Sequence, residues 1–322
     1  MSELVSVVIV GYNNWPDLEM AIQSALCQSY TPAEVIVIDN SSTDATPEEV
    51  PKRFGGRIRY VRQPNRGDSG AYNTGMALAR GQFIQFLDGD DVLSPNKIEK
   101  QIEIFLSGPG IDIVYSYASC FQTHAGGITQ LSQQDVPSSD RLEHFLLNDG
   151  QGAGTALGVL FRRAALERVG LWDETMYCTD ADYELRALWL GCHFRFCPIS
   201  PCGFYRIRPG QMSGDVLKML RGREALWGKG LTYIDREPYL SVIRQNLART
   251  KVLVAIRDQA LIAERARAVI REARSICRDA ISLPAYFCCL ILVSIPWGRR
   301  MAISRRLRTI NLWVARCLGI VT

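Results

Sequence analysis

The sequence has few histidines and no paired cysteine motif, and both absences exclude classes of metal site. Three histidines occur among 322 residues. The ten cysteines are scattered, and no CxxC pair is accompanied by a second pair or by a histidine, so a structural zinc site is not expected. Several cysteines lie in apolar runs, as reduced core cysteines do, which makes a reducing compartment the default expectation.

A secretory signal is also missing from the start of the sequence. Met1-Ser2-Glu3 leads directly into the apolar run 4–10, without a basic segment before it or a cleavage site after it. We therefore expect this run to be a buried strand. The residues that follow, Gly11-Tyr12-Asn13-Asn14, lack the glycine- and lysine-rich phosphate loop of a nucleotidyltransferase, which argues against that class of enzyme.

Charge is unevenly divided along the chain. Residues 1–214 hold 17 Lys and Arg against 25 Asp and Glu, whereas residues 215–322 hold 20 against 8. We therefore expect a weakly acidic catalytic domain over 1–214 and a helical, Arg-rich region over 215–322 that meets an anionic partner. Residues 280–297 carry no charge, but the run is short for a membrane span of about 20 residues. Together with the basic amphipathic pattern after it, this segment favours membrane-surface binding, with a core helix as the alternative.

The first half of the sequence alternates between strand and helix patterns. β-branched runs are followed by segments whose apolar residues recur at helical spacing. Strands separated by helices predict an α/β fold with a mostly parallel, Rossmann-like sheet flanked by helices. The strands are expected at 4–10, 35–38, 58–61, 83–87, 111–117 and 157–161. The helices are expected at 16–27, 47–53, 71–80, 94–106, 163–169 and 182–190.

Three carboxylates stand within four residues after the predicted strand 83–87, in Asp88-Gly89-Asp90-Asp91. No Lys or Arg follows before Lys97, so the sequence offers no adjacent charge to relieve their repulsion. Carboxylate oxygens are ligands for Mg²⁺ and Mn²⁺, and open α/β sheets bind ligands at the carboxyl ends of their strands. We therefore expect a divalent cation at Asp88 and Asp90 that bridges the phosphates of a nucleotide. A structural turn is the alternative, and it suits Asp91 best.

Two other predicted strands end in residues that would reach the same edge of the sheet. Asp39 follows the strand 35–38, and Tyr12 follows the strand 4–10. The carboxylate of Asp39 is placed to accept hydrogen bonds from a base or ribose, and Tyr12 is placed to flank the base. The polar turn 41–44 is expected to be purely conformational. With Asp88 and Asp90, these strand ends predict one crevice.

These segments resemble the ordered motifs of the family 2 glycosyltransferases with the GT-A fold. The similarity covers roughly residues 4–213 and not the region after it, and four motifs in order over about 90 residues are a specific signal. The resemblance implies a GT-A domain, an inverting reaction and a DxD cation site. The four motifs lie at 8–14, 37–44, 65–75 and 86–91, and later similarity lies at 161–164, 170–174 and 182–185.

The resemblance also implies roles for individual residues. Asp39 would hold the nucleobase with Tyr12 beside it, and Asn65 and Gly67 would lie near the base and ribose. Asp90 would be the direct ligand of Mn²⁺ or Mg²⁺, and Asp88 would contact the ribose or the cation. The complete expected donor-binding set is Tyr12, Asn14, Asp39, Asn65, Gly67, Asn73, Asp88 and Arg208.

Asp182 matches the aspartate that acts as the general base in inverting members of the family. Many members have Glu-Asp at this point, but this sequence has Ala181-Asp182, so Asp180 is a rival. The base would remove a proton from an acceptor hydroxyl while that oxygen attacks the anomeric carbon of the sugar. A carboxylate that stabilises the start of a helix is the structural alternative for Asp182, and both roles can coexist.

The sequence departs from the family pattern at two positions. Tyr72 stands where the family often has Arg, before the asparagine of the third motif. Tyr205-Arg206-Ile207-Arg208 stands where many members have Tyr-Arg-x-His, whose histidine is a further metal ligand. A guanidinium cannot bind a cation, but Arg208 could neutralise a diphosphate directly. We therefore expect the cation to have fewer protein ligands here.

The sequence thus predicts a glycosyltransferase that moves a sugar from a nucleoside-diphosphate donor to a hydroxyl of a saccharide or lipid-linked glycan. A UDP-sugar is the first candidate donor, with dTDP- and GDP-sugars as alternatives. Surface polysaccharide synthesis is expected, with peripheral attachment at the cytoplasmic face of a membrane and no nucleic-acid partner. The alternative is a non-catalytic nucleotide-sugar-binding scaffold of a glycan assembly complex, against which Asp88, Asp90 and Asp182 argue.

Overall fold

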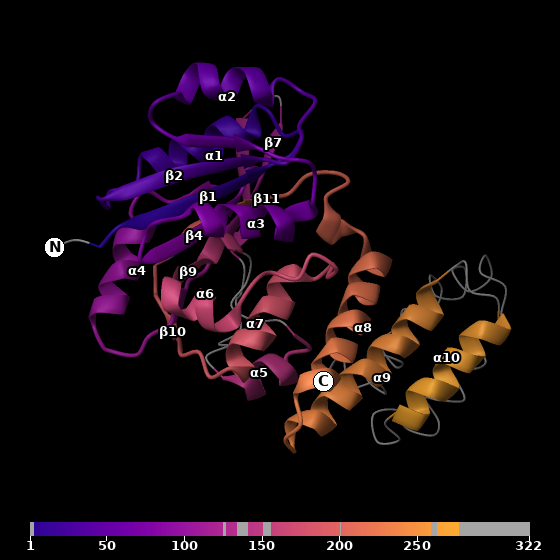
Figure 1. Cartoon of the computed structure of the whole chain (residues 1–322). Helices are drawn as coiled ribbons and strands as arrows, with labels where there is room; N and C mark the ends of the chain where they lie inside the picture. The colour runs from indigo at the N-terminus through magenta and orange to yellow at the C-terminus, as the bar shows by residue number, and fades with distance from the viewer. Residues whose placement is uncertain are drawn as a thin grey trace. The chain divides into compact units, whose positions relative to one another are not determined.

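The computed structural model describes residues 3–124, 127–133, 141–150, 156–199, 201–258 and 263–276. The chain divides into two compact units, Met1–Gln211 and Met212–Thr322. Both sheets lie in the first unit, and the described part of the second unit is helical (Figure 1). The assignment of a catalytic domain to 1–214 and of an appended region to 215–322 remains a prediction.

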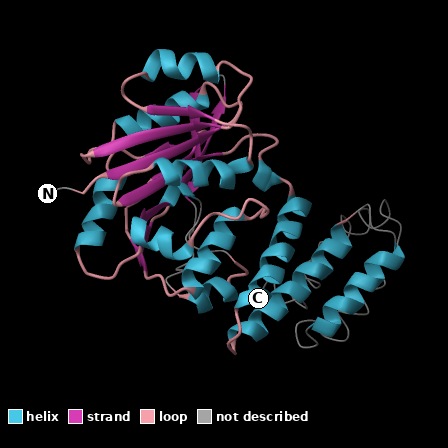
Figure 2. Cartoon of the chain, in the orientation of Figure 1, coloured by secondary structure: helices cyan, strands magenta, loops and turns pink. Residues whose placement is uncertain are grey.

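A seven-stranded sheet forms the centre of the first unit, with helices on both of its faces (Figure 2). Its strands are β1 (Val5–Gly11), β2 (Ala33–Asp39), β3 (Arg59–Arg62), β4 (Phe83–Asp88), β6 (Ile113–Tyr115), β9 (Val159–Arg162) and β10 (Phe194–Phe196). Their order across the sheet is β10-β6-β9-β4-β1-β2-β3. All neighbours are parallel except β9, which is antiparallel to both β4 and β6. The predicted α/β class with a mostly parallel sheet is confirmed.

Strands that are covered on both faces explain the near-continuous apolar runs in the sequence. All seven residues of β1 are buried, and so are the first five of β4. Val7 of β1 belongs to a core cluster that also contains Leu18, Val50 and Ile98 from helices on one face. On the other face a Cβ atom at Gly75 would lie 2.1 Å from Cγ1 of Val8, so glycine lets a helix pack closely against β1.

The helices of the first unit follow the predicted pattern closely at most positions. The helix expected at 163–169 is present with those bounds, and the one expected at 71–80 begins four residues earlier. A short helix at 142–147 was not predicted. The α-helices are α1 (Asp17–Leu26), α2 (Thr46–Phe54), α3 (Gly67–Leu78), α4 (Lys97–Leu106), α5 (Leu142–Leu147), α6 (Arg163–Val169) and α7 (Thr179–Trp189).

A second, four-stranded sheet was not predicted as a unit. Its strands are β5 (Val92–Leu93), β7 (Ser119–His124), β8 (Gly127–Gln133) and β11 (Gly203–Arg206), and their order is β5-β11-β7-β8. β7 and β8 are antiparallel neighbours, and His124 pairs with Gly127. β5 follows the acidic segment 88–91 directly, and its neighbour β11 carries Arg206, so this sheet links two candidate site segments.

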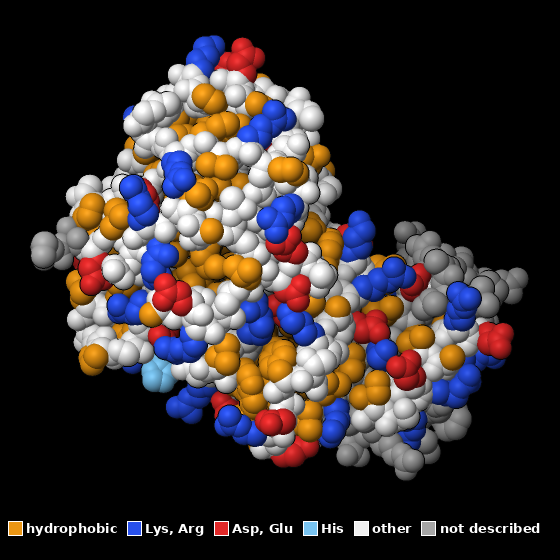
Figure 3. Space-filling view, viewed as in Figure 1, with side chains coloured by type: hydrophobic (Ala, Val, Ile, Leu, Met, Phe, Trp, Pro, Cys, Tyr) orange, Lys and Arg blue, Asp and Glu red, His pale blue; other side chains and the backbone are white. Residues whose placement is uncertain are grey.

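The described part of the second unit consists of α8 (Val216–Tyr233), α9 (Tyr239–Arg257) and α10 (Ala263–Ile276). Ala266, Ile270 and Ala273 are fully buried at helical spacing, so one stripe of α10 is packed. No helix within the described ranges is both long enough and apolar enough to cross a membrane. The apolar segment 280–297 lies outside those ranges. On the face in Figure 3, acidic and basic side chains are interspersed.

Candidate active site

The carboxyl ends of three neighbouring strands meet at one edge of the central sheet. Gly11 at the end of β1 pairs with Asp39 at the end of β2, and Val10 pairs with Asp88 at the end of β4. Tyr12, which follows β1 directly, is 49% exposed. The parallel register therefore brings these residues to one edge of the sheet, and the crevice expected there remains a prediction.

Asp39 is completely buried and is held by three groups of the protein. Its Oδ1 accepts a hydrogen bond from the backbone N–H of Ser42 at 2.8 Å, and its Oδ2 accepts one from the hydroxyl of Tyr60 at 2.6 Å. The Nε atom of Arg62 lies 3.5 Å from Oδ2. These partners fix the orientation of the carboxylate, so a nucleobase would have to share acceptors that are already in use.

The acidic segment 88–91, called the acidic loop below, packs directly on the end of β1. A Cβ atom at Gly89 would lie 2.8 Å from the carbonyl oxygen of Val10 and 2.6 Å from Nδ2 of Asn14. Glycine is therefore needed for this close approach. Asn14 is 8% exposed, and its Oδ1 has no hydrogen-bond partner among the described residues. Asn14 thus lies under the acidic loop with an acceptor available.

Asn65 lies in the loop that leads into α3, and Gly67 is the first residue of that helix. The side-chain oxygen of Asn65 accepts hydrogen bonds from the backbone of Gly67 at 2.9 Å and from Nδ2 of Asn40 at 3.1 Å. Gly67 has a φ of +68°, a conformation that favours glycine. Asn40 follows Asp39, so this network ties the loop to the end of β2.

Asn73 holds a loop in place, although the sequence suggested a donor contact. Its Nδ2 donates to the carbonyl oxygen of Trp172 at 2.9 Å, and its Oδ1 accepts from the backbone N–H of Trp172 at 2.8 Å. Arg66 makes a second connection to the same loop through Glu174, with 2.5 Å between Nη2 and Oε1. Both contacts join α3 to the segment that precedes α7.

Tyr72, one of the two departures from the family pattern, donates a hydrogen bond to Oδ1 of Asp88. The ring of Tyr72 is buried against Phe86 and Trp172, with centroids 4.9 and 5.1 Å away. Burial raises the pKa of Asp88 well above its usual value, and the nearby charges of Asp68, Asp90 and Asp180 raise it further. The hydrogen bond from Tyr72 opposes this shift by stabilising the charged form.

Arg208, the second departure, pairs with the expected cation ligand. Its Nη2 lies 3.0 Å from Oδ2 of Asp90, and the two side chains are 43% and 19% exposed. The guanidinium therefore occupies one oxygen of the carboxylate that the sequence assigned to the metal. Arg208 thus lies beside Asp90 at the edge of the sheet where the strands end.

Arg206 holds the acidic loop through bonds to Asp90 and Asp91. The sequence did not indicate this role of Arg206. Arg206 is 2% exposed, and its Nε donates to the carbonyl oxygen of Asp90 at 2.8 Å. Its backbone N–H donates to Oδ1 of Asp91 at 2.9 Å, and its Nη2 lies 3.3 Å from Oδ1 of Asp17. Asp91 is 1% exposed, which agrees with the structural role expected for it.

The two candidate bases on α7 differ in their surroundings. Asp182 is 1% exposed, and Nε of Arg186 lies 3.0 Å from its Oδ2. Asp180 is partly exposed, and it lies near enough for its charge to raise the pKa of Asp88 and Tyr72. Although the residue as a whole is partly exposed, its carboxyl group is enclosed, and this desolvation, followed by the charge of Asp68, raises the pKa of Asp180 to about 7. Of the two, Asp180 is the carboxylate whose charge acts on Asp88 at the end of β4.

Asp68 is a further acidic residue of the site that the sequence did not indicate. It lies in the first turn of α3, and desolvation of its carboxyl followed by the charge of Asp90 raises its pKa. Asp68 lies close enough to Asp90 and Asp180 to interact with their charges, and this proximity depends on how α3 packs in the fold. A search for carboxylates directly after strands therefore misses it.

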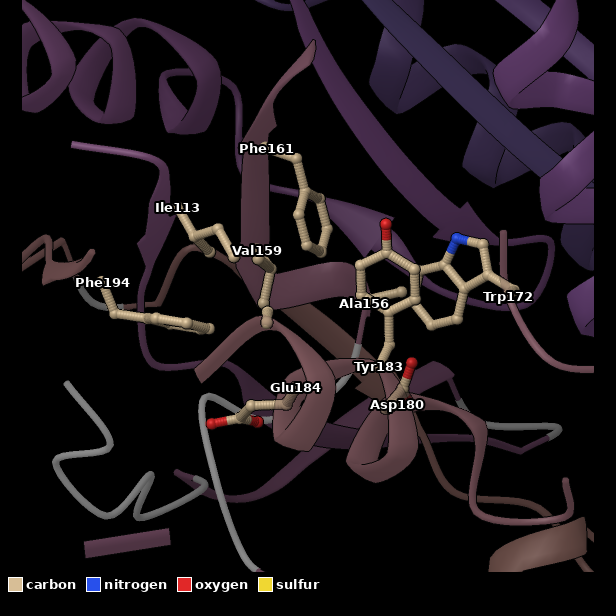
Figure 4. Close-up of a pocket in the computed structure, with 10 residues that line it drawn as sticks. Ile113, Ala156, Val159, Phe161, Trp172, Asp180, Tyr183, Glu184 and Phe194 are labelled. Carbon is tan, nitrogen blue, oxygen red and sulfur yellow. The ribbon is translucent and has the colours of Figure 1, made fainter. Parts of the chain in front are cut away.

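A small pocket lies beside Asp180, lined mainly by apolar and aromatic side chains. Figure 4 shows Asp180, Tyr183 and Glu184 on one helix, with Trp172 beside Tyr183. The rings of Trp172 and Tyr183 stack with centroids 4.1 Å apart, and Trp172 is 3% exposed, so Trp172 is a core residue. The cavity volume is about 20 Å³, which suits a water molecule and not a sugar ring.

Within the described ranges, no three acidic, histidine or cysteine side chains form a metal site by themselves. Asp88 and Asp90 offer two carboxylates, and Mg²⁺ is commonly held by one or two carboxylates, with water and substrate phosphates supplying the rest. Burial and then the neighbouring charges of Asp68, Asp90 and Asp180 raise the pKa of Asp88, and a cation would relieve the charge repulsion. The residues therefore fit a cation that arrives with a phosphorylated donor.

Comparisons with known proteins agree with this architecture. An uncharacterized glycosyltransferase of Nostoc sp. is 30% identical over 170 residues, which are 51% of this chain and 52% of that protein. The succinoglycan biosynthesis protein ExoO of Rhizobium meliloti is 31% identical over 219 residues, 65% of this chain and 62% of ExoO. This chain thus matches only about half of the length of the Nostoc relative.

Among solved structures, a mannosyltransferase from Pyrobaculum calidifontis in complex with GDP-Man and Mn²⁺ has a similar fold. The TM-score is 0.58 at 18% identity, and the match covers 97% of this chain and 83% of the other. The central sheet flanked by helices is therefore of the GT-A type. Residues 6–170 match glycosyl transferase family 2. The chain belongs to this family and is a glycosyltransferase.

Proposed function

We propose that the enzyme transfers a sugar from a nucleoside-diphosphate sugar to a hydroxyl of a saccharide or lipid-linked glycan, with inversion at the anomeric carbon. A UDP-sugar is the first candidate donor. The observation that carries the proposal is the gathering of Asp39, Asp88 and Asp90 at one edge of the sheet, with Asp180 close enough for its charge to act on Asp88. This arrangement offers separate groups for a nucleotide, a cation and an acceptor hydroxyl.

The nucleoside is proposed to bind over the ends of β1 and β2. Asp39 would accept hydrogen bonds from the base, and the exposed ring of Tyr12 would lie beside it. Two contacts of the protein already orient the carboxylate of Asp39, so little freedom is lost when the nucleoside binds. Asn65 and Gly67 shape the adjoining loop, and Asn14 supports the acidic loop from beneath.

The donor diphosphate is proposed to bind at Asp88 and Asp90 together with Mn²⁺ or Mg²⁺. When bound, the cation supplies positive charge that stabilises the departing nucleoside diphosphate. Arg208 extends into the same place and offers a guanidinium for the phosphates. Tyr72 holds the carboxylate of Asp88, and Arg206 holds the main chain of Asp90, so the acidic loop is in place before the donor arrives.

Asp180 is proposed as the general base. Its carboxylate would take the proton of the acceptor hydroxyl while that oxygen forms a bond to the anomeric carbon and the bond to the diphosphate oxygen breaks. A pKa of about 7 suits this task, because about half of the groups are then ionised at neutral pH and the carboxylate is still basic enough to accept a proton. Asp182 is proposed to support α7 through Arg186.

Surface polysaccharide synthesis is proposed as the setting. ExoO is by its name a succinoglycan biosynthesis protein, and the similarity of this chain to ExoO makes an exopolysaccharide or its lipid-linked precursor a reasonable acceptor. The net positive charge of residues 215–322 supports peripheral attachment at the cytoplasmic face of a membrane. The full-length chain should float with vesicles that contain anionic lipids and should stay behind with neutral ones. Equal behaviour with both would contradict the attachment.

A donor screen tests the proposal. The thermal unfolding of the purified full chain would be followed with UDP-, dTDP- and GDP-sugars, each with Mn²⁺, Mg²⁺ or EDTA. A donor at 100 times its Kd stabilises the folded state by about 2.7 kcal/mol, so one family of donors should stand out. Asp90→Ala should remove the cation-dependent part of the shift. A stabilising donor that is neither hydrolysed nor transferred would favour the scaffold alternative over the enzyme.

A further inference from the structure

The ion pair between Arg208 and Asp90 closes off the carboxylate that a cation would use. Nη2 of Arg208 lies 3.0 Å from Oδ2 of Asp90. At this distance the guanidinium forms an ion pair with an oxygen that a divalent cation would also take as a ligand. The guanidinium and a cation cannot both occupy that oxygen, because their charges repel and the space is shared.

The main chain on both sides of this pair is fixed, whereas the side chain of Arg208 is not. Arg206 is buried and bonded to the carbonyl oxygen of Asp90, and the backbone N–H of Arg208 donates to Oε1 of Gln211 at 2.7 Å. Nε2 of Gln211 in turn donates to the hydroxyl of Tyr205 at 3.2 Å. Arg208 itself is 43% exposed. A change of partner for Arg208 therefore needs only rotation of its side chain.

Acidic groups surround the pair on several elements. Charges of Asp90 and Arg208 both act on Asp17 at the start of α1, and the charge of Asp90 acts on Asp68 of α3. Asp88 lies beside Asp90 on the acidic loop. The excess of carboxylates keeps the guanidinium in place without a donor. A diphosphate would bring more negative charge and a better bidentate acceptor for Arg208.

We propose that Arg208 holds the place of the divalent cation on Asp90 in the donor-free enzyme and moves to the diphosphate when the donor and the cation bind together. This inference rests on the proposed function, because it takes a nucleoside diphosphate as the ligand. Arg208 then suppresses binding of the cation alone and couples cation binding to donor binding. The coupling is reciprocal: a nucleotide must tighten the cation by the same factor as the cation tightens the nucleotide.

Arg208→Gln tests this exchange, with Mn²⁺ affinity measured directly by the paramagnetic resonance signal of the free ion. Without nucleotide, the variant should bind Mn²⁺ about three- to tenfold more tightly than the wild type, since the competing group is gone. UDP in EDTA, followed by calorimetry, should bind more weakly to the variant. The factor by which UDP tightens Mn²⁺ should be smaller in the variant. GDP would replace UDP if the donor screen identifies GDP-sugars.

Arg168→Gln is the matched control. Arg168 is also 43% exposed, and its Nη1 lies 3.1 Å from Oδ2 of Asp112, at the start of β6 and thus at the opposite edge of the sheet. The substitution Arg168→Gln removes the same charge from a similar ion pair, so Mn²⁺ and UDP affinities should stay at wild-type values. Asp90→Asn should abolish the Mn²⁺ binding that Arg208→Gln strengthens.

The possible results separate this inference from the proposed function. If wild-type protein binds UDP with Mn²⁺ but Arg208→Gln leaves both affinities and their coupling unchanged, the exchange is wrong and the proposed donor site stands. Mn²⁺ binding that persists in Asp90→Asn would also overturn the exchange. If none of the nucleoside diphosphates binds to the wild type, the proposed function itself fails. If UDP tightened Mn²⁺ binding by a larger factor in Arg208→Gln than in the wild type, the change would be opposite to the one expected and would contradict the exchange.

Discussion

Arg186 pairs with Asp182 across one turn of α7, with its Nε atom 3.0 Å from Oδ2 of the carboxylate. The pair is enclosed, since the two side chains are 16% and 1% exposed. Arg186 also donates to the carbonyl oxygens of Val169 and Leu171 at 2.9 and 3.0 Å. The pair therefore ties α7 to the segment before it, which supports a structural role for Asp182 and leaves Asp180 as the candidate base.

Substitution of each aspartate by asparagine should separate these roles. Asp180→Asn is expected to lower kcat by about 10²- to 10⁴-fold, because the acceptor hydroxyl loses its proton acceptor. Asp182→Asn is expected to lower the free energy of unfolding by about 2 kcal/mol, since the largely enclosed Arg186 loses its buried charged partner. Steady-state transfer rates and urea unfolding of both variants measure the two effects. Loss of transfer in Asp182→Asn with unchanged stability would make Asp182 the base.

The activity should fall on the acidic side of neutrality. Burial raises the pKa of Asp180 from 3.8 to about 7, so the base becomes protonated as the pH drops below 7. A single ionisation lowers kcat/KM about tenfold for each pH unit below that pKa, and kcat/KM reports the free enzyme. The measurement is kcat/KM between pH 5.5 and 8.5 with a non-limiting cation. A flat profile from pH 6 to 8 would exclude a base with this pKa.

The same shift has a predictable consequence for stability. The folded pKa of Asp180 is above the unfolded value, so between pH 3.8 and about 7 the unfolded chain loses this proton before the folded one does. Ionisation of Asp180 thus destabilises the fold as the pH rises. Asp180→Asn should therefore be at least as stable as the wild type at pH 8, which distinguishes it further from Asp182→Asn.

Much of the central sheet is predictable because strands that are buried on both faces have continuous apolar runs in the sequence. The run over residues 4–10 becomes β1, and Asp39 and Asp88 end β2 and β4 as expected. The direction of β9 is not predictable in this way. Its apolar run looks like that of a parallel strand, but its pairing with β4 and β6 is antiparallel, and direction depends on contacts distant in sequence.

The site is predictable only where its residues follow strands. Arg206 lies 115 residues after Asp91, and their contact depends on the pairing of β11 with β5 in a sheet that the sequence did not reveal. Asp68 lies on a helix, and the packing of that helix decides which carboxylates it meets. Asn73 is assigned to the donor site because of its place in a family motif. In the structure both ends of its amide contact the backbone of Trp172, and its contact with a donor stays a prediction.

Gly89→Ala should damage the acidic loop. The added Cβ atom would lie 2.8 Å from the carbonyl oxygen of Val10, which is backbone and cannot turn away. The loop would have to shift, at an expected cost of about 1–3 kcal/mol in unfolding free energy. Asp88 and Asp90 would move with it, so cation-dependent donor binding should weaken as well. Urea unfolding and donor thermal shifts measure the two effects.

Gly108→Ala is the control for this substitution. No heavy atom lies within 4 Å of the Cβ position at Gly108, apart from its own chain neighbours. The free energy of unfolding should therefore stay the same or rise slightly, because alanine restricts the unfolded chain more than glycine does. If Gly89→Ala were as stable and as active as Gly108→Ala, the close packing of the acidic loop on β1 would not matter for the site.

Lys97 of α4 should make the fold more stable as the pH rises above neutrality. Its side chain is completely buried, and its ammonium group donates to Oε1 of Gln85 on β4. Burial lowers the pKa of Lys97 from 10.5 to about 7. Between these values the unfolded chain carries a proton that the folded chain lacks, so stability rises with pH and is progressively lost as the pH falls toward 7.

Lys97→Met should remove this slope. One proton difference corresponds to about 1.4 kcal/mol per pH unit, so the wild type should gain up to about that amount relative to Lys97→Met between pH 7.5 and 8.5. The window stays below the range in which buried Cys202, whose pKa burial raises to about 11, would act with the opposite sign. Urea unfolding at several pH values gives the difference in slope. The slope is decisive because Lys97→Met also deprives Gln85 of a hydrogen-bond donor, which changes absolute stability at every pH. Equal slopes would show that Lys97 keeps its proton on folding.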